Sequence, residues 1–159
     1  MTMRPLSESD YSAFEKLFCD YYAELDCEED PLPLFNDYLL PDLKAGLFDV
    51  GVAEVDGAVV GFIIFQIDDL INDWNFKEGC GDVRELYVAP PFRRRGFGTA
   101  LLQFAESALL KSGATEIYTL PVEECESFFA ARGFTDSGEY CADADNKVFV
   151  KNIDKSDIV

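Results

Sequence analysis

The sequence has 159 residues, 48% of them apolar and 28% charged, which suits one compact domain of common size and excludes wholesale disorder. Thirteen lysines and arginines stand against 31 aspartates and glutamates, so the formal net charge is −18. A chain this acidic is repelled by phosphate backbones and anionic lipids, so we expect neither nucleic acid nor membranes as partners. No apolar run reaches the ~18 residues of a transmembrane helix, and the start lacks the apolar stretch of a signal peptide. We therefore expect a cytoplasmic protein with a single domain, residues 1–159.

Two features of the composition narrow the chemistry. The sequence has no histidine, which excludes Ser-His and Cys-His nucleophile pairs and histidine-ligated metals. Its five cysteines are an odd number and form no Cys-x-x-Cys pair, which argues against a disulfide framework and against a zinc site. We expect no bound metal.

The first half is predicted to hold a strand, two helices and a hairpin. Residues 2–5 can form a short strand, and Ser7 with the acid three residues later has the pattern that begins a helix. An acidic stretch ending at Pro31 breaks that helix, and a second, shorter one is expected over 33–45. Asp56-Gly57 between two apolar runs predicts a hairpin, because both turn positions need a positive φ. The first helix has apolar residues at helical spacing, namely Tyr11, Phe14, Leu17, Phe18, Tyr21 and Leu25.

The second half is predicted to alternate strands and helices. A loop at 68–81 is followed by a strand at 83–88, a helix at about 98–112 that stops at Gly113, a strand at 115–120, a helix at 123–132 closed by Gly133, and a terminal antiparallel pair that includes 146–152. The whole order is β-α-α-β-β-β-α-β-α-β-β. It predicts a mixed α/β domain with helices on both faces of the sheet.

One stretch carries the chemistry. The strand at 83–88 ends at Ala89-Pro90-Pro91, and a loop with Gly96 and Gly98 then opens a helix. The free N–H groups and dipole of a helix start can bind a phosphate, and glycine lets the ligand approach the backbone. A dinucleotide fingerprint would need a glycine where Leu101 stands, and the Gly-Lys-Ser/Thr of a P-loop is absent. A tight turn with exposed arginines is the alternative interpretation.

These residues resemble a known family. The GNAT superfamily of N-acetyltransferases has Arg/Gln-x-x-Gly-x-Gly/Ala after a Val-x-Pro strand end, and here Val88-Ala89-Pro90 precedes Arg93-Arg94-Arg95-Gly96-Phe97-Gly98. A second family element, Phe-Tyr-x-x-x-Gly-Phe, is similar to residues 128–134. The element order matches over nearly the whole chain. The resemblance implies a GNAT-like fold with a mixed sheet of about six to seven strands, in which the fourth and fifth strands splay apart.

The resemblance also implies an activity and its cofactor. A GNAT protein moves an acetyl group from acetyl-CoA to a primary amine by direct attack in a ternary complex. Backbone amides of the loop from Arg93 to Thr99 would hold the pyrophosphate, and backbone groups near Leu86 and Val88 would pair with the pantetheine arm. An amide near Leu86 would polarise the thioester carbonyl. The implied cofactor-binding residues are Leu86, Tyr87, Val88, Arg93, Arg94, Arg95, Gly96, Phe97, Gly98 and Thr99.

The sequence indicates the residues for proton transfer less clearly than those for cofactor binding. Asp82 and Glu85 are the candidate general bases, acting through water, or each is a solvated charge or a partner of Arg84. They face opposite sides of a regular strand, so at most one is expected to serve, although a bulge would exchange them. The tyrosine that often protonates the thiolate in this family is replaced by Phe129, which leaves Tyr140 or water as the general acid. The asparagine that commonly follows the next strand is also missing.

The distribution of charge is the main indication of which amine acts as the acceptor. Residues 1–82 have a net charge of −15, which favours a cationic amine such as a polyamine, an aminoglycoside-like amine or a peptide amine, or else only keeps the surface soluble. Tyr21, Tyr22, Trp74 and Phe76 are candidate pocket residues. A CoA-binding regulatory module that has lost catalysis is the main alternative, and modification of charged tRNA would require a basic groove. We expect a monomer or a homodimer joined through the terminal strands.

Overall fold

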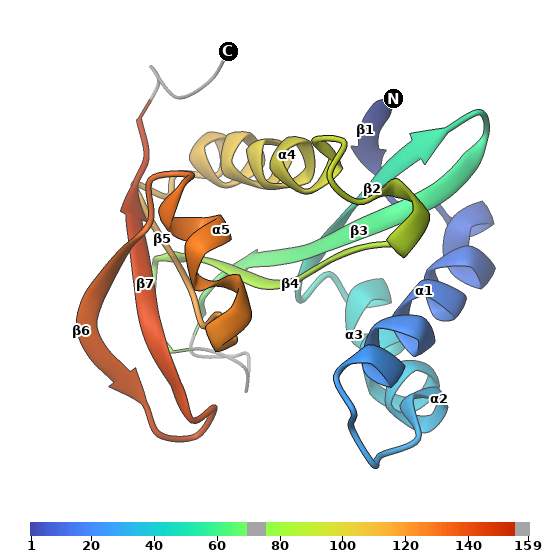
Figure 1. Ribbon diagram of the computed structural model, residues 1–159, viewed down its shortest axis with the longest axis horizontal. Helices are drawn as coiled ribbons and strands as arrows, with labels where there is room; N and C mark the ends of the chain where they lie inside the picture. The colour runs from blue at the N-terminus through green and yellow to red at the C-terminus, as the bar shows by residue number, and fades with distance from the viewer. Residues whose placement is uncertain (70–75, 155–159) are drawn as a thin grey trace. The chain divides into compact units, whose positions relative to one another are not determined.

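The computed structural model describes residues 1–69 and 76–154, which form two compact units (Figure 1). The first consists of Met1–Ile64 and Glu85–Phe104, and the second of the described parts of Phe65–Arg84 and Ala105–Val159. Strands β3 (Ala58–Ile67) and β4 (Gly81–Val88) and helix α4 (Phe97–Lys111) each run from one unit into the other. The strand order is β1-β2-β3-β4-β5-β7-β6, which confirms the predicted mixed α/β fold at seven strands. The splaying of β4 from β5 involves both units and stays a prediction.

The first unit holds the predicted strand, helices and hairpin. Its further elements are β1 (Thr2–Pro5), the 3-10 turn η1 (Glu8–Asp10), α1 (Tyr11–Glu24), α2 (Pro31–Leu34), the π-helical turn η2 (Phe35–Leu39), α3 (Leu40–Lys44), β2 (Asp49–Val55) and the 3-10 turn η3 (Pro90–Phe92). The helix expected over 33–45 therefore begins two residues early, where the Asp30 carboxylate accepts the N–H of Leu32 at 3.0 Å and caps it.

Aromatic packing builds the core of this unit. Phe14 of α1 is fully buried, and its ring lies edge-on to Phe35 and Phe62, with centroids 5.2 and 5.1 Å apart. Phe62 of β3 and its alternate neighbour Ile64 face this cluster. Gly61 alternates with Phe62 and faces the other side, where it approaches Leu101 near the start of α4. Helices α1 to α3 thus cover one face of β2 and β3, and the first part of α4 covers the other (Figure 1).

The hairpin and the helix ends follow from backbone angles. Asp56 and Gly57 have φ values of 51° and 80°, as the Asp-Gly turn requires. Gly113 has a φ of 101°, and its N–H bonds the carbonyl of Leu110, which ends α4 where predicted.

The second unit carries the C-terminal strands. Its further elements are β5 (Glu116–Thr119), the 3-10 turn η4 (Glu123–Cys125), α5 (Glu126–Ala130), β6 (Thr135–Cys141) and β7 (Asn146–Asn152). The helix predicted over 123–132 is a 3-10 turn followed by a short α-helix. Strands β4 and β5 are parallel, with Gly81 opposite Ile117 and Val83 opposite Thr119, so β4 begins two residues before the predicted start.

Strand β6 is the outer strand of this order and pairs irregularly with β7. Asp136 lies opposite Phe149 and Tyr140 opposite Lys147, so β6 has two extra residues between these pairs. Gly138 supplies the positive φ of 82° that this bulge needs.

Among residues 1–69 and 76–154, no helix is both long and apolar enough to cross a membrane.

We predict that Asp10 anchors the start of α1. Its carboxylate accepts from Arg4 Nη1 and Nη2 at 2.7 and 2.9 Å and from the Ser7 N–H at 2.9 Å, and the Arg4 guanidinium holds the pKa of Asp10 well below its usual range. Asp10→Asn should lower the free energy of unfolding by about 1–3 kcal/mol at pH 7. Because the folded pKa is depressed, this stabilisation is complete above the unfolded pKa near 3.9 and is lost as pH falls below it. Chemical denaturation from pH 7 to 2 should therefore show a shallower acid loss for the variant.

The control for Asp10 is Asp20→Asn, which removes an exposed pair with Lys16. It should change stability by less than about 0.5 kcal/mol. Equal losses in the two variants would contradict the anchoring role.

Candidate active site

A left-handed turn joins β4 to α4 in the first unit. After η3, Arg94 and Gly96 have φ values of 62° and 85°. A Cβ on Gly96 would meet no atom within 4 Å, so the backbone angle rather than crowding favours glycine there. Arg94 adopts the same unfavourable region with a side chain, which marks a backbone held in place by its surroundings.

The start of α4 is suited to an anion. A helical bond from the Ala100 N–H to the Gly96 carbonyl at 3.0 Å connects the helix to this turn. The N–H groups of the first turn of α4 lie at the N-terminal end of the helix, where backbone donors point out of the helix toward the loop. The dipole of a 15-residue helix adds positive potential at this end. Loop and helix start together form a concentrated set of backbone donors.

The three arginines of the loop have different surroundings. Arg93 donates from Nε to the Val88 carbonyl at 2.8 Å and from Nη2 to Glu24 at 2.7 Å, and it lies 5.4 Å from the centre of the Tyr87 ring. Arg95 lies over two rings of the loop, Phe92 and Phe97, at 5.5 and 5.7 Å. Arg94 is exposed. The side chain of Arg93, predicted as a cofactor ligand, is thus directed at the protein itself.

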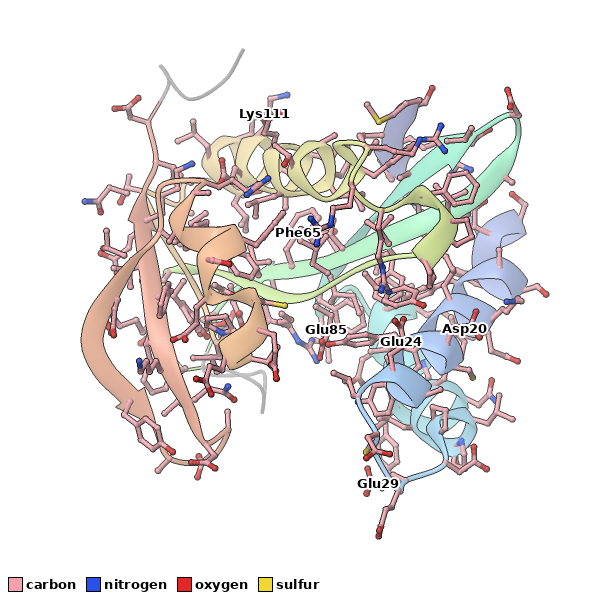
Figure 2. All side chains as sticks on the ribbon, in the orientation of Figure 1. Asp20, Glu24, Glu29, Phe65, Glu85 and Lys111 are labelled. Carbon is pink, nitrogen blue, oxygen red and sulfur yellow. The ribbon has the colours of Figure 1, made fainter. Side chains whose placement is uncertain are left out.

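Glu24 is the last residue of α1 and the acidic partner of this cluster. The Arg93 guanidinium and the Tyr87 hydroxyl both hold the pKa of Glu24 below its usual range. Burial raises the pKa of Tyr87, and its bond to Glu24 raises it further. Figure 2 shows Glu24 and Asp20 on α1 together with Glu85 of β4.

Glu85, one of the two predicted bases, also faces α1. Its carboxylate accepts a hydrogen bond from the Tyr21 hydroxyl and is half-buried. The Tyr21 ring contacts Tyr87 two residues further along β4, with centroids 5.5 Å apart. This carboxylate is therefore positioned by an aromatic neighbour and remains partly accessible to water.

The backbone of β4 offers donors on a defined edge. The Ala89 N–H bonds the Val60 carbonyl of β3, so residue 89 points toward β3. Backbone groups alternate along a strand, so the N–H groups of Leu86 and Val88 point to the opposite edge. The predicted oxyanion donor, Leu86, lies on that edge.

Asp82, the other predicted base, belongs to a polar network in the second unit. It is only 6% exposed, and its charge adds to the effect of burial in raising the pKa of Tyr118. The Tyr118 hydroxyl donates to Asp68, which also accepts from the backbone N–H groups of Phe76 and Lys77 at 2.7 and 2.8 Å. The predicted opposite orientation of Asp82 and Glu85 relates the two units and stays a prediction.

The remaining predicted residues lie in less informative surroundings. Tyr140 is 56% exposed on the outer strand β6, and Phe129 is buried against Phe134 at 5.4 Å. Tyr21 and Tyr22 pack against the aromatic core, Phe76 is exposed beside Tyr118, and Trp74 falls outside the described residues.

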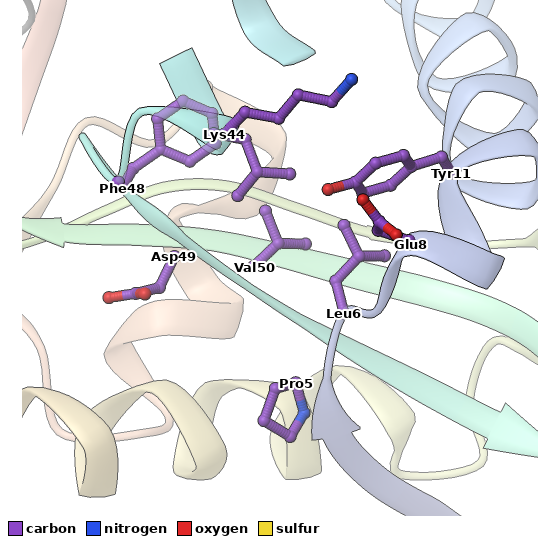
Figure 3. A pocket seen from close by; sticks show the side chains of 10 residues that line it. Pro5, Leu6, Glu8, Tyr11, Lys44, Phe48, Asp49 and Val50 are labelled. Atoms are coloured by element: carbon purple, nitrogen blue, oxygen red, sulfur yellow. The ribbon is translucent and has the colours of Figure 1, made fainter. Parts of the chain in front are cut away.

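A separate pocket of about 570 Å³ opens at the other end of α1 (Figure 3). Its walls include Leu6, Tyr11, Lys44, Phe48 and Val50. Tyr11 begins α1 and Glu24 ends it, so about 20 Å of helix separates this pocket from the Arg93 cluster. Within residues 1–69 and 76–154, no group of three or more acidic or cysteine side chains could hold a metal ion.

Sequence reasoning missed Glu24 and Asp68. Glu24 lies three residues after Tyr21 and seven after Leu17, so it continues the apolar stripe of α1, and an acid at such a position is a usable signal. Asp68 follows a strand of apolar residues with nothing in the pattern to indicate that it would be 2% exposed.

This combination of fold and glycine turn defines an acyltransferase-type scaffold. The profile of the Acetyltransferase (GNAT) family matches residues 11–134, and the chain belongs to this family.

Similar proteins are consistent with this membership. An N-alpha-acetyltransferase of Sulfurisphaera tokodaii is 35% identical over 100 residues, which cover 57% of this chain and 54% of that protein. An uncharacterised N-acetyltransferase of Lactobacillus delbrueckii subsp. lactis is 30% identical over 91 residues, 55% of this chain and 51% of that protein. The alignments thus span about half the length of these curated relatives.

Solved structures share the fold. The PaiA N-acetyltransferase of Thermoplasma acidophilum, crystallised with coenzyme A, has a TM-score of 0.73 at 19% identity, over 96% of this chain and 100% of that one. A GCN5-related N-acetyltransferase from Ralstonia eutropha JMP134 has a TM-score of 0.69 at 26% identity, over 88% of this chain and 95% of that one.

We predict that Asp68 holds its unit together. In Asp68→Asn an amide NH₂ would replace one acceptor oxygen and face N–H donors, so the free energy of unfolding should fall by about 1–3 kcal/mol. Chemical denaturation measures this, with Asp143→Asn at an exposed turn position as the control, expected within about 0.5 kcal/mol of the unchanged protein. Equal stability of the two variants would contradict a structural role for the network.

Proposed function

We propose that the protein is an N-acetyltransferase that moves the acetyl group of acetyl-CoA to a primary amine by direct attack in a ternary complex. The observation that carries this proposal is the left-handed glycine turn from β4 into α4 in a chain of the GNAT family. The names of its relatives and the coenzyme A in the PaiA structure support it.

The loop from Arg93 to Thr99 is the proposed pyrophosphate site. Its N–H groups and the α4 dipole would bind the anion without a metal ion. The N–H groups of Leu86 and Val88 would then bind the pantetheine and the thioester oxygen, and the Leu86 amide would stabilise the tetrahedral oxyanion. Gly98 and the residues around it complete the cofactor-binding set.

Glu85 is the proposed general base. An ammonium must lose a proton before it can attack, and Glu85 is partly open to water, so a water molecule can carry the proton to it. Asp82 is a weaker candidate, since its carboxylate is buried beside Tyr118 and serves the polar network. The Tyr21 hydroxyl would keep the Glu85 carboxylate oriented.

Water is the proposed proton donor to the departing thiolate. The usual tyrosine position is Phe129, which has no proton to give and packs against Phe134. Tyr140 is the remaining candidate. Its side chain is 56% exposed on β6, so little packing holds its hydroxyl in one orientation.

The acceptor is proposed to be cationic. In the first unit α1 ends beside Glu85, and the following segment 26–30 is exposed and holds four acids. The negative end of the α1 dipole adds to this potential. A polyamine, an aminoglycoside-like amine or a basic peptide amine would each be attracted to it.

A GNAT-fold regulatory module that binds CoA without catalysis is the second candidate. The observation that favours it is Phe129, since the family's usual proton donor is missing there. Such a module would bind CoA and release no thiol with any amine.

We predict turnover with cationic amines and a salt dependence of their KM. Thiol release from acetyl-CoA should be measured with spermidine, an aminoglycoside, a lysine-rich peptide and an uncharged-tail primary amine, in 50 and 300 mM salt. The KM of the first three should rise severalfold with salt, because screening weakens the attraction of their several charges, while the KM of the last, which carries a single ammonium charge, should rise least. A salt-independent KM for every acceptor contradicts the electrostatic part of the proposal, and no turnover with retained CoA binding supports the regulatory module.

We predict that Glu85→Gln lowers kcat by about 100-fold at pH 7. The loss should shrink as pH approaches the pKa of the amine, near 10, because the free amine then needs no base. Steady-state rates from pH 6 to 10 would test this, with thermal unfolding to verify the fold. A kcat defect that is independent of pH would remove Glu85 as the base.

A further inference from the structure

An ion pair in the first unit ties the end of α1 to the start of the glycine turn. Glu24 Oε2 lies 2.7 Å from Nη2 of Arg93, and the Nε of the same guanidinium donates to the Val88 carbonyl at 2.8 Å. The guanidinium also lies 5.4 Å from the centre of the Tyr87 ring. Helix α1, the end of β4 and the turn thus meet at one side chain.

The Glu24–Arg93 ion pair has more contacts that fix its geometry than an isolated surface pair has. Its two side chains are 42% and 40% exposed, and an isolated pair at such exposure would do little. Here the guanidinium has a carbonyl and a ring as further partners, and the Glu24 carboxylate also holds the Tyr87 hydroxyl. The hydrogen bond to Glu24 raises the pKa of Arg93, so the guanidinium stays positively charged opposite the carboxylate. Several partners fix one geometry where a single contact would not.

The turn needs a fixed start. Between Arg93 and α4 the chain passes through two left-handed positions, Arg94 and Gly96, and reaches the Ala100 bond only four residues after the second. Its far end is fixed by α4. Its near end has two backbone bonds, from the Phe92 N–H to Ala89 and from the Arg93 N–H to Pro90 at 2.9 and 3.2 Å, and the side chain of Arg93 ties it in addition to Val88 and Glu24.

We propose that Glu24 is a positioning residue for the anion-binding turn. It acts through Arg93, whose guanidinium stays on Glu24 and Val88 and holds the backbone donors of the turn in place before the ligand arrives. The side chain of Arg93 then supports the backbone of the turn and does not bind the phosphate. The inference rests on the proposed assignment of the CoA pyrophosphate to this turn.

The test is a double-mutant cycle on CoA binding by the full chain. Calorimetric titration with CoA should be made for the unchanged protein, Glu24→Gln, Arg93→Gln and the double variant. Each single variant should weaken CoA binding about 5- to 10-fold, and the double variant should be no weaker than Arg93→Gln, because the two residues act as one unit. A multiplicative loss in the double variant would overturn the proposal.

A kinetic comparison separates positioning from acceptor binding. In Glu24→Gln the KM for acetyl-CoA should rise by the same factor as the dissociation constant, while kcat and the KM of a cationic amine stay within twofold. Unchanged CoA affinity with a raised amine KM would make Glu24 part of the acceptor site and overturn the proposal.

A matched control comes from the same unit. Arg4 and Glu54 form an ion pair at 2.5 Å with side chains 30% and 28% exposed, so Glu54→Gln removes a similar charge away from the turn and should leave CoA affinity unchanged. If the unchanged protein does not bind CoA, the proposed function fails. If it binds and Glu24→Gln binds equally well, only the positioning role fails.

Discussion

The connection between β4 and α4 restricts the backbone angles of the chain, and the rest of the site depends on this restriction. The chain must leave a strand, turn through two left-handed residues and start a helix within a few residues. Glycine meets this demand at position 96, but Arg94 does not meet it by itself. The surrounding contacts have to supply what the residue type lacks, and Arg93 and Arg95 provide them through Glu24 and the rings of Phe92 and Phe97. Two arginines of this loop therefore have structural partners within the protein, beside the binding function proposed for the backbone of the loop.

Much of this arrangement follows from the sequence. The hairpin at Asp56-Gly57, the helix stop at Gly113 and the glycine turn rest on local backbone preferences that any tertiary structure must respect. Boundaries were less predictable. The helix expected at 33 begins at Pro31 because Asp30 caps it, and a π-helical turn interrupts it, which no periodicity indicates.

Side-chain partners could not be predicted in the same way. Arg93 was expected to bind a cofactor, and its partner Glu24 is 69 residues away in the sequence. Asp82 and Glu85 were equivalent as candidates until their surroundings separated them, one buried in a polar network and the other half-buried against Tyr21. Such differences depend on tertiary contacts, and a single sequence has no local signal for them.

The acidic excess is also less uniform than its total suggests. Asp10 is tied to Arg4, Glu24 to Arg93, and Asp68 to donors within its own unit. The charges of Arg4 and Arg93 offset those of Asp10 and Glu24, while Asp68 keeps its charge and has its hydrogen bonds satisfied by neutral donors. Segment 26–30 is exposed and holds four acids, so it adds a local negative potential at the surface of the first unit.

The irregular strand β6 has a consequence for self-association. An exposed strand edge is a template on which another chain can add a strand, and proteins that stay dispersed commonly block it. In β6 the N–H of Gly138 is taken by the Asp136 carboxylate and that of Glu139 by the Ser137 hydroxyl, at 2.9 and 3.1 Å. Two consecutive backbone donors are thereby occupied, and acidic side chains flank the bulge. These two donors are therefore not available to an added strand, and the bulge interrupts the regular run of donors that strand addition needs.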